Sequence, residues 1–131
     1  GLGIRHAMVV HGEDGFDEIS ISAPTKVAEI KDGGIFEYTI TPEQFGLPLA
    51  EKEEVVGGSP EENALITQGI LAGTIRDAKR NIVLLNAGCA LYVVGQAGSI
   101  GDGVALAAEM IDSGAALAKL EELKQFTNAL A

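Results

Sequence analysis

The spacing of apolar residues divides the chain near residue 41, where a period of two gives way to one close to 3.6. The run from Ala7 to Val10 is short and rich in β-branched residues, which predicts a buried strand. Residues 19–22 alternate between isoleucine and serine, and we expect them to be extended as well. The extended pattern resumes at Lys26 after Pro24.

A β-hairpin is predicted between residues 26 and 40. The turn residues Lys31-Asp32-Gly33-Gly34 follow the segment from Lys26 to Ile30, and Phe36, Tyr38 and Ile40 then alternate with polar residues. Two extended segments joined by such a short, glycine-containing turn pair in the antiparallel direction.

The second half of the chain predicts helices. Thr41-Pro42-Glu43-Gln44 and Ser59-Pro60-Glu61-Glu62 both place an N-cap residue before proline and a Gln or Glu at the third helical position. The second of these opens a helix that we expect to end at Gly73, after a connecting loop at residues 47–58. Residues 80–95 are apolar nearly all round, which indicates a helix buried on most of its faces.

The glycine-rich segment 95–103 resembles a phosphate-binding loop only superficially. It lacks the G-x-G-x-x-G spacing and joins two helical patterns, so we expect Ser99 or Asp102 to cap the following helix. Val104, Ala107, Ala108 and Ile111 form one apolar face, and Leu117, Leu120, Leu123 and Leu130 form another, behind a cap at Ser113. Asn86 is either a ligand contact or a tether to neighbouring backbone, and we favour the tether.

These elements predict one α/β domain over residues 1–131. A central sheet with the hairpin at or near its edge would be surrounded by helices, and the C-terminal half would be helical.

The charge balance argues against two classes of partner. Nineteen acidic against nine basic residues give a net charge of −10, which repels nucleic acid and anionic membrane surfaces. The single Cys89 cannot form an intrachain disulfide and lies in an apolar run, so we expect a buried structural thiol and a reducing, cytoplasmic location. The longest apolar stretch is too short to span a bilayer, and no secretory leader is evident.

The segment from His11 to Ser20 is the strongest functional signal, because it sets four carboxylates among glycines directly after a predicted strand. Carboxylate oxygens beside flexible glycines suit Mg²⁺, which completes its octahedron with water and substrate phosphates. The alternative is a solvated acidic connector. An EF-hand is excluded, since its alternating ligands and closing glutamate are absent. His11 could approach a phosphate, although a structural role is the commoner one for a lone histidine.

Several segments, taken together and in order, resemble the anthranilate phosphoribosyltransferase family. They are Val9-Val10-His11-Gly12 running into Gly15-Phe16-Asp17-Glu18-Ile19-Ser20, then Pro24-Thr25-Lys26-Val27, Thr41-Pro42-Glu43, Gly46-Leu47, Glu62-Asn63-Ala64, the run from Asn81 to Ala87, Ala105-Leu106-Ala107, and the run from Asp112 to Leu117. The resemblance covers essentially this whole chain but only the C-terminal part of the family's catalytic α/β domain, which has a phosphoribosyltransferase or nucleoside phosphorylase-like fold.

The resemblance implies a transferase of tryptophan biosynthesis, a glycosyltransferase that moves phosphoribosyl from phosphoribosyl pyrophosphate to anthranilate. The family's adjacent Asp-Glu pair, which holds Mg²⁺ against the leaving pyrophosphate, maps onto Asp17 and Glu18. Glu13 and Asp14 are not matched to that role, and we expect them to be solvated.

The resemblance also implies what this sequence lacks. The family's phosphate-cradling Gly-Thr-Gly-Gly-Asp loop, its Lys-His-Gly-Asn segment and its anthranilate-binding Arg have no equivalent here, so the chain carries no catalytic or cofactor-binding residue besides the metal pair. We therefore expect the isolated chain to be inactive, and to self-associate as a homo-oligomer through strand edges and apolar faces left open. Two alternatives remain: a relative of the pyrimidine nucleoside phosphorylases, and a non-catalytic acidic interaction module.

Overall fold

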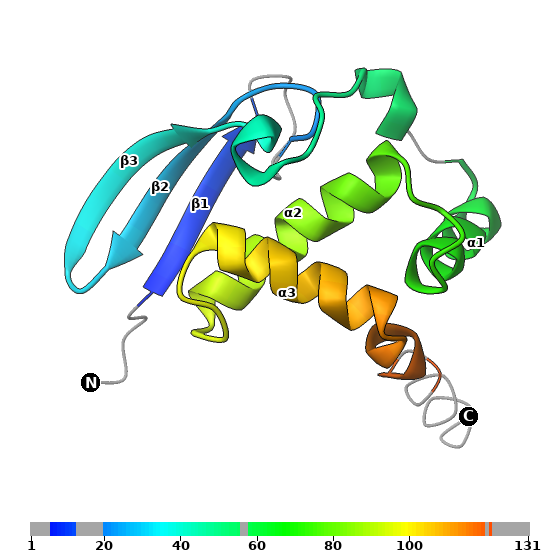
Figure 1. The fold of residues 1–131 in the computed structure, drawn as a ribbon. Helices are drawn as coiled ribbons and strands as arrows, with labels where there is room; N and C mark the ends of the chain where they lie inside the picture. The colour runs from blue at the N-terminus through cyan, green and yellow to red at the C-terminus, as the bar shows by residue number, and fades with distance from the viewer. Residues whose placement is uncertain (1–5, 13–19, 56–57, 120, 122–131) are drawn as a thin grey trace.

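The computed structural model describes residues 6–12, 20–55, 58–119 and 121. Three antiparallel strands lie on one side of the molecule and the helices on the other, with α2 and α3 crossing beside the sheet and α1 furthest from it (Figure 1). The mixed α/β fold and the helical second half are therefore confirmed. No described helix is long and apolar enough to cross a membrane.

The sheet has the order β1-β2-β3, with β1 at His6–Gly12, β2 at Thr25–Lys31 and β3 at Gly34–Ile40. Asp32 and Gly33 make the turn between β2 and β3 with positive φ angles of 51° and 78°. Two successive left-handed residues match the twist of a two-residue hairpin, and Asp and Gly tolerate that conformation best. The predicted hairpin is confirmed.

Two expectations about the extended segments were wrong. The strand at Ala7 to Val10 is not buried: β1 is an edge strand among the described residues, and Val9 is 64% exposed. Residues 21–23 form a bend, because the Ser20 hydroxyl accepts hydrogen bonds from the amides of Ser22 and Ala23 at 3.0 and 3.1 Å. A serine side chain that satisfies nearby amides in this way competes with strand pairing. Ile19 lies outside the described residues.

Both predicted N-cap sequences start a helix, but the one at Thr41 starts only a short 3₁₀ helix. The Ser59 hydroxyl accepts from the Glu62 amide at 3.2 Å and opens α1, Pro60–Leu71, which Gly73 follows with φ of 82°. The signal at Thr41 opens only the 3₁₀ helix η1, Pro42–Phe45, because Gly46 ends it with φ of 76°. A second 3₁₀ helix, η2 at Lys52–Val55, lies within the predicted connecting loop.

Helices α2, Ala78–Val93, and α3, Ile100–Asp112, pack most closely where two glycines meet. A methyl group on Gly88 would lie 2.6 Å from the Val104 amide nitrogen, and one on Gly103 would overlap the Gly88 carbonyl. Ser99 rather than Asp102 caps α3, since its hydroxyl accepts from the Asp102 amide at 3.0 Å. The two helix backbones therefore approach each other closely at these glycines.

The core lies between the helices and one face of the sheet. Its buried apolar members are Ile21, Val27, Ile40, Leu47, Ile70, Leu84, Leu85, Cys89, Ile100, Val104, Ala107 and Ile111. The predicted apolar face of α3 supplies three of them, and Ala108 packs against the cluster. Of the second predicted face, Leu120, Leu123 and Leu130 lie outside the described residues.

Candidate functional site

The acidic segment joins β1 to the residues before β2, and both of its ends meet at one buried residue. Gly12, the last residue of β1, pairs with Thr25 across the sheet. The Ser20 amide donates to the Thr25 hydroxyl at 2.9 Å, and both residues are buried. Asp17 and Glu18, the predicted metal ligands, lie outside the described residues, as do Glu13 and Asp14. The described residues therefore fix where the segment starts and where it returns.

The returning end is anchored in the core as well as in the sheet. Ile21 is completely buried, and its carbonyl accepts a hydrogen bond from the Ala50 amide at 2.9 Å. Because Ile21 directly follows Ser20, the segment leaves and re-enters the fold through ordered, buried backbone. A ligand-binding segment mounted on rigid elements in this way can hold its side chains with greater precision than a free loop.

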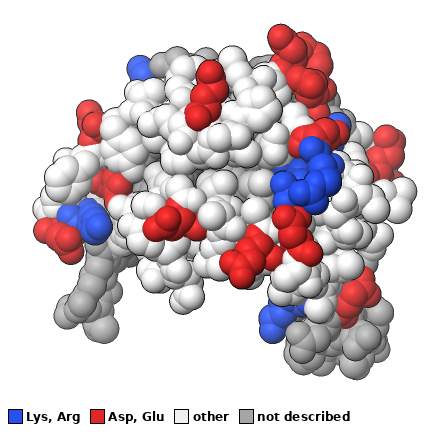
Figure 2. Space-filling model, in the orientation of Figure 1, with Lys and Arg blue, Asp and Glu red and all other residues white. Residues whose placement is uncertain are grey.

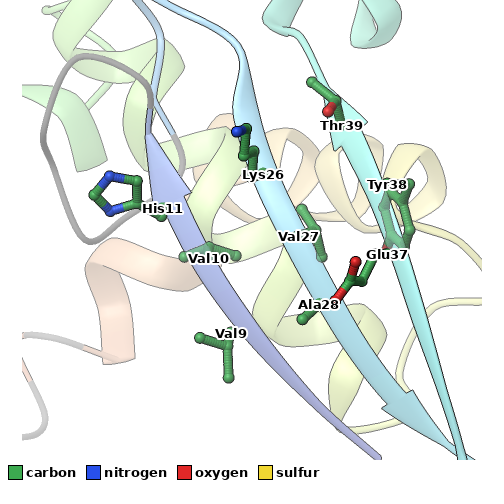
Figure 3. A pocket seen from close by; sticks show the side chains of 9 residues that line it. All are labelled: Val9, Val10, His11, Lys26, Val27, Ala28, Glu37, Tyr38 and Thr39. Carbon is green, nitrogen blue, oxygen red and sulfur yellow. The ribbon is translucent and has the colours of Figure 1, made fainter.

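A depression of about 510 Å³ lies over the sheet beside the start of this segment (Figure 3). At one end of it, His11, Lys26 and Thr39 occupy matching positions on β1, β2 and β3. Two residues further along the strands, Val9 on β1 and Ala28 on β2 line an apolar part of the depression. Glu37 is paired with Ala28 and occupies the matching position on β3. The depression thus offers an imidazole, an ammonium and a hydroxyl group near the beginning of the acidic segment.

The described residues do not supply a metal cage of their own. Among residues 6–12, 20–55, 58–119 and 121, no three His, Cys, Asp or Glu side chains are grouped so that they could hold an ion. Acidic side chains are instead scattered over the face shown in Figure 2, where few basic groups lie among them.

A buried polar cluster around Glu29 is the feature that sequence reasoning missed. The Glu29 carboxylate lies 2.6 Å from each of three groups: His6 Nε2, the Tyr38 hydroxyl and the Tyr92 hydroxyl. These partners come from β1, β3 and α2, and the His6 and Tyr92 rings meet edge to face at 4.8 Å. Glu29 shares the inward face of β2 with Val27, so the period-two pattern could have identified it as a buried carboxylate.

The Glu29 cluster fixes the sheet onto α2 rather than performing acid–base chemistry. Burial by itself would raise the pKa of Glu29, but the hydrogen bonds from Tyr38, Tyr92 and His6 outweigh it and the pKa is lowered. The hydrogen bond to Glu29, together with burial, raises the pKa of Tyr92 to about 12, and burial and Glu29 also raise that of Tyr38. A carboxylate that stays ionised and phenols that stay protonated transfer no proton near neutral pH.

Three further residues have structural roles. Asn86 Nδ2 donates to the Ile82 carbonyl one turn earlier at 2.9 Å, which confirms the backbone tether. Cys89 is buried, and burial followed by the nearby Glu29 charge raises its pKa to about 12, so it is not a nucleophile. Arg80 is buried and bonds to Asp112 at 2.9 Å, which joins α2 to the end of α3.

Comparison with known proteins gives the same family from sequence and from structure. The family model described as "Glycosyl transferase family, a/b domain" matches residues 1–117. Curated relatives named anthranilate phosphoribosyltransferase include one from Methanobrevibacter smithii, 51% identical over 98% of this chain, and one from Rubrobacter xylanophilus, 48% identical over 100% of it. In both cases this chain spans 38% of the relative.

Solved structures agree with these matches. The anthranilate phosphoribosyltransferase of Thermus thermophilus superimposes with a TM-score of 0.81 at 39% identity, over 89% of this chain and 34% of that one. The enzyme of Saccharomyces cerevisiae in complex with PRPP and Mg gives 0.79 at 27% identity, over 88% of this chain and 33% of that one. The chain therefore belongs to the glycosyl transferase family and forms part of its α/β domain.

Proposed function

We propose that this chain is the C-terminal part of an anthranilate phosphoribosyltransferase, which transfers the phosphoribosyl group of phosphoribosyl pyrophosphate to anthranilate in tryptophan biosynthesis. One observation carries the proposal: the relatives with that name are about half identical to this chain, over nearly all of its length. The Saccharomyces cerevisiae neighbours solved with PRPP and Mg and with 4-fluoroanthranilate support the substrates.

We propose Asp17 and Glu18 as the residues that bind Mg²⁺. Two adjacent carboxylates provide the hard oxygen ligands that this ion takes from proteins, alongside water and substrate phosphates. Bound Mg²⁺ would neutralise the charge that develops on the leaving pyrophosphate. The attachment of both ends of their segment to Thr25 supports the proposal, because it ties the segment to the rigid sheet.

The remaining residues of this chain would hold the segment in place. Thr25 and Ser20 secure its returning end in a buried hydrogen bond, and Ile21 secures that end in the core. Glu13 and Asp14 would remain solvated. With a net charge of −10, the chain would need metal ions, or basic groups from elsewhere in the full-length enzyme, to neutralise two anionic substrates. We therefore propose that the chain alone is inactive.

A joined protein tests the proposal directly. The joined protein is a chimera in which this chain replaces the matching segment of the Methanobrevibacter smithii relative, with which it shares 51% identity. We expect the joined protein to consume anthranilate, followed by its fluorescence, only when phosphoribosyl pyrophosphate and Mg²⁺ are both present. The isolated chain should show no turnover. A joined protein that folds but is inactive, next to an active unmodified relative, would refute the proposed function.

We also propose a cytoplasmic location and self-association of the isolated chain. A single buried cysteine suits a reducing compartment. Leu49 and Leu65 are large apolar side chains that are exposed, and we propose that they bring copies together. Cell fractionation and light scattering at several concentrations check the two statements separately.

A further inference from the structure

We propose that the Asp32-Gly33 peptide, at the tip of the hairpin formed by β2 and β3, is a site of spontaneous covalent modification. At this site the aspartate converts to isoaspartate through a cyclic succinimide. The inference concerns one turn of the backbone and not the transfer reaction, so it does not depend on the proposed function. It rests on the chemistry of an aspartate followed by glycine and on the surroundings of the Asp-Gly pairs that the structure describes.

The reaction needs only these two residues and water. The Gly33 nitrogen attacks the side-chain carboxyl carbon of protonated Asp32, whose hydroxyl group leaves with the amide proton as water, and a five-membered succinimide ring forms. Water then opens the ring at either of its carbonyl groups. One opening restores aspartate, and the other gives isoaspartate, in which the main chain runs through the side-chain carbon. A following glycine favours the attack, because it has no side chain to shield its nitrogen.

The two reacting groups are exposed and unhindered. Asp32 and Gly33 are both exposed, and among the described residues none forms a hydrogen bond or an ion pair with the Asp32 side chain. A methyl group placed on Gly33 would meet nothing within 4 Å. Neither the carboxyl group nor the space around the attacking nitrogen is therefore occupied by other parts of the fold.

The turn leaves the attacking amide outside the ladder of the sheet. Lys31 pairs with Gly34, which makes Asp32 and Gly33 the two central residues of the hairpin turn, with φ angles of 51° and 78°. In a two-residue turn the strand pairing ends at the flanking residues. The Gly33 amide is consequently not held by a strand partner.

Little packing stabilises this end of the hairpin. It lies at the margin of the molecule, away from the helices (Figure 1), and the neighbouring Ile35 and Phe36 are 69% and 57% exposed. Segments with few buried apolar contacts open locally at a small cost in free energy. We therefore expect the turn to open often enough for the Gly33 nitrogen to reach the Asp32 carboxyl group.

The second described Asp-Gly pair provides a control within the same chain. Asp102-Gly103 lies in the first turn of α3, where the Gly103 amide donates to the Ser99 carbonyl at 3.0 Å. Gly103 is also buried, against Gly88 of α2. Attack by the Gly103 nitrogen would require α3 to unwind at its close contact with α2, so the fold protects this pair.

Isoaspartate would change the hairpin permanently. It adds one carbon atom to the main chain between Lys31 and Gly34, and the two-residue turn then no longer matches their pairing. Further along the same strands, the Tyr38 hydroxyl donates to the Glu29 carboxylate at 2.6 Å. We expect this buried bond to confine the change to the end of the hairpin.

Incubation of the joined protein in water labelled with the heavy oxygen isotope tests the inference. Each passage through the succinimide places labelled oxygen in the residue, whether aspartate or isoaspartate forms. Trypsin, added afterwards in ordinary water, cleaves after Lys26, Lys31, Lys52, Arg80 and Lys119, so Asp32 and Asp102 fall in different peptides. The third pair, Asp14-Gly15, lies outside the described residues and falls in a peptide of its own. Fragment masses then locate the label.

We expect Asp32 to take up the label at least about 10-fold faster than Asp102 in the folded protein. In urea, where no fold protects either pair, the two rates should be similar. Equal rates in the folded protein would overturn the inference. So would a folded protein in which Asp32 stays unlabelled over a time that labels it in urea.

Two variants at the same position give a second readout. Asp32→Glu keeps the charge but is too long to close the five-membered ring, so the label at this position should be lost. Asp32→Asn suits the turn equally well and should react faster than aspartate, releasing ammonia in place of the first water. Label that persists in Asp32→Glu would contradict the mechanism, as would an Asp32→Asn variant that releases no ammonia.

Discussion

The two faces of the small sheet are built from alternate residues of the same strands but differ in what covers them. Thr25, Val27 and Glu29 of β2 face the helices and are buried, whereas Lys26 and Ile30 face away and are exposed. The covered face combines an apolar core with one fully bonded carboxylate. The open face is apolar around β1 and polar beside the acidic segment. The comparison indicates that this chain completes its packing on one side of the sheet only.

The largest effect should come from the core under the covered face. Leu85 is completely buried, so Leu85→Ala should leave a cavity and lower the free energy of unfolding by about 2–5 kcal/mol. Denaturant titration of the joined protein measures the loss. A loss below about 1 kcal/mol would contradict the close packing of the core around Leu85.

An intermediate effect should come from the buried carboxylate. Glu29→Gln removes the charge and replaces one carboxylate oxygen, which faces one or two of the three partners, by an amide NH2 group. This should cost about 1–3 kcal/mol of unfolding free energy. The matched control, Glu37→Gln on the exposed face, should stay within about 0.5 kcal/mol. Equal losses in the two variants would show that the two faces do not differ in polar burial.

Acidic pH should abolish the contribution of ionised Glu29 to the free energy of unfolding. Its pKa in the folded state lies below the ordinary 4.5, so ionised Glu29 favours folding above that pH. This contribution is lost as the pH falls through the lowered pKa of the folded state. The stability difference between the unmodified protein and Glu29→Gln should therefore be constant near neutrality and shrink below about pH 4.5, as urea titrations at several pH values would show. A difference that grows on acidification would contradict the assignment.

The smallest effect should come from the open face of the isolated chain. Val9→Ser should change the unfolding free energy of the chain alone by less than about 0.5 kcal/mol, because Val9 is already exposed. In the joined protein, where we expect the rest of the α/β domain to cover this face of the sheet, the same change should cost about 1–3 kcal/mol. Equal costs in the two proteins would argue that nothing covers Val9.

The sequence predicted those parts of the fold that depend on local rules. The Asp32-Gly33 turn and the Ser59 and Ser99 caps satisfy nearby backbone groups, so short stretches of sequence identify them. The environment of β1 and the partners of the Glu29 carboxylate could not be predicted in this way. Glu29 draws its partners from as far away as Tyr92 on α2, and strand burial depends on which elements are present to cover it.

For the candidate site, the sequence supplied the acidic segment and the structure supplied its attachment. The resemblance named Asp17 and Glu18, and the role of Thr25 in holding both ends of their segment became visible only from strand pairing and a buried hydrogen bond. The assignment of the metal ligands remains a prediction, because the two residues lie outside the described part of the chain.

The most direct test of the account is the Mg²⁺ dependence of phosphoribosyl transfer by the joined protein carrying Asp17→Asn and Glu18→Gln. The matched control carries Glu13→Gln and Asp14→Asn, which make the same change of charge within the same segment. We predict that the first pair loses Mg²⁺-dependent turnover by at least about 100-fold while its unfolding curve is unchanged, and that the second pair keeps it within a few-fold. Equal turnover of the two pairs, at every Mg²⁺ concentration, would contradict the account.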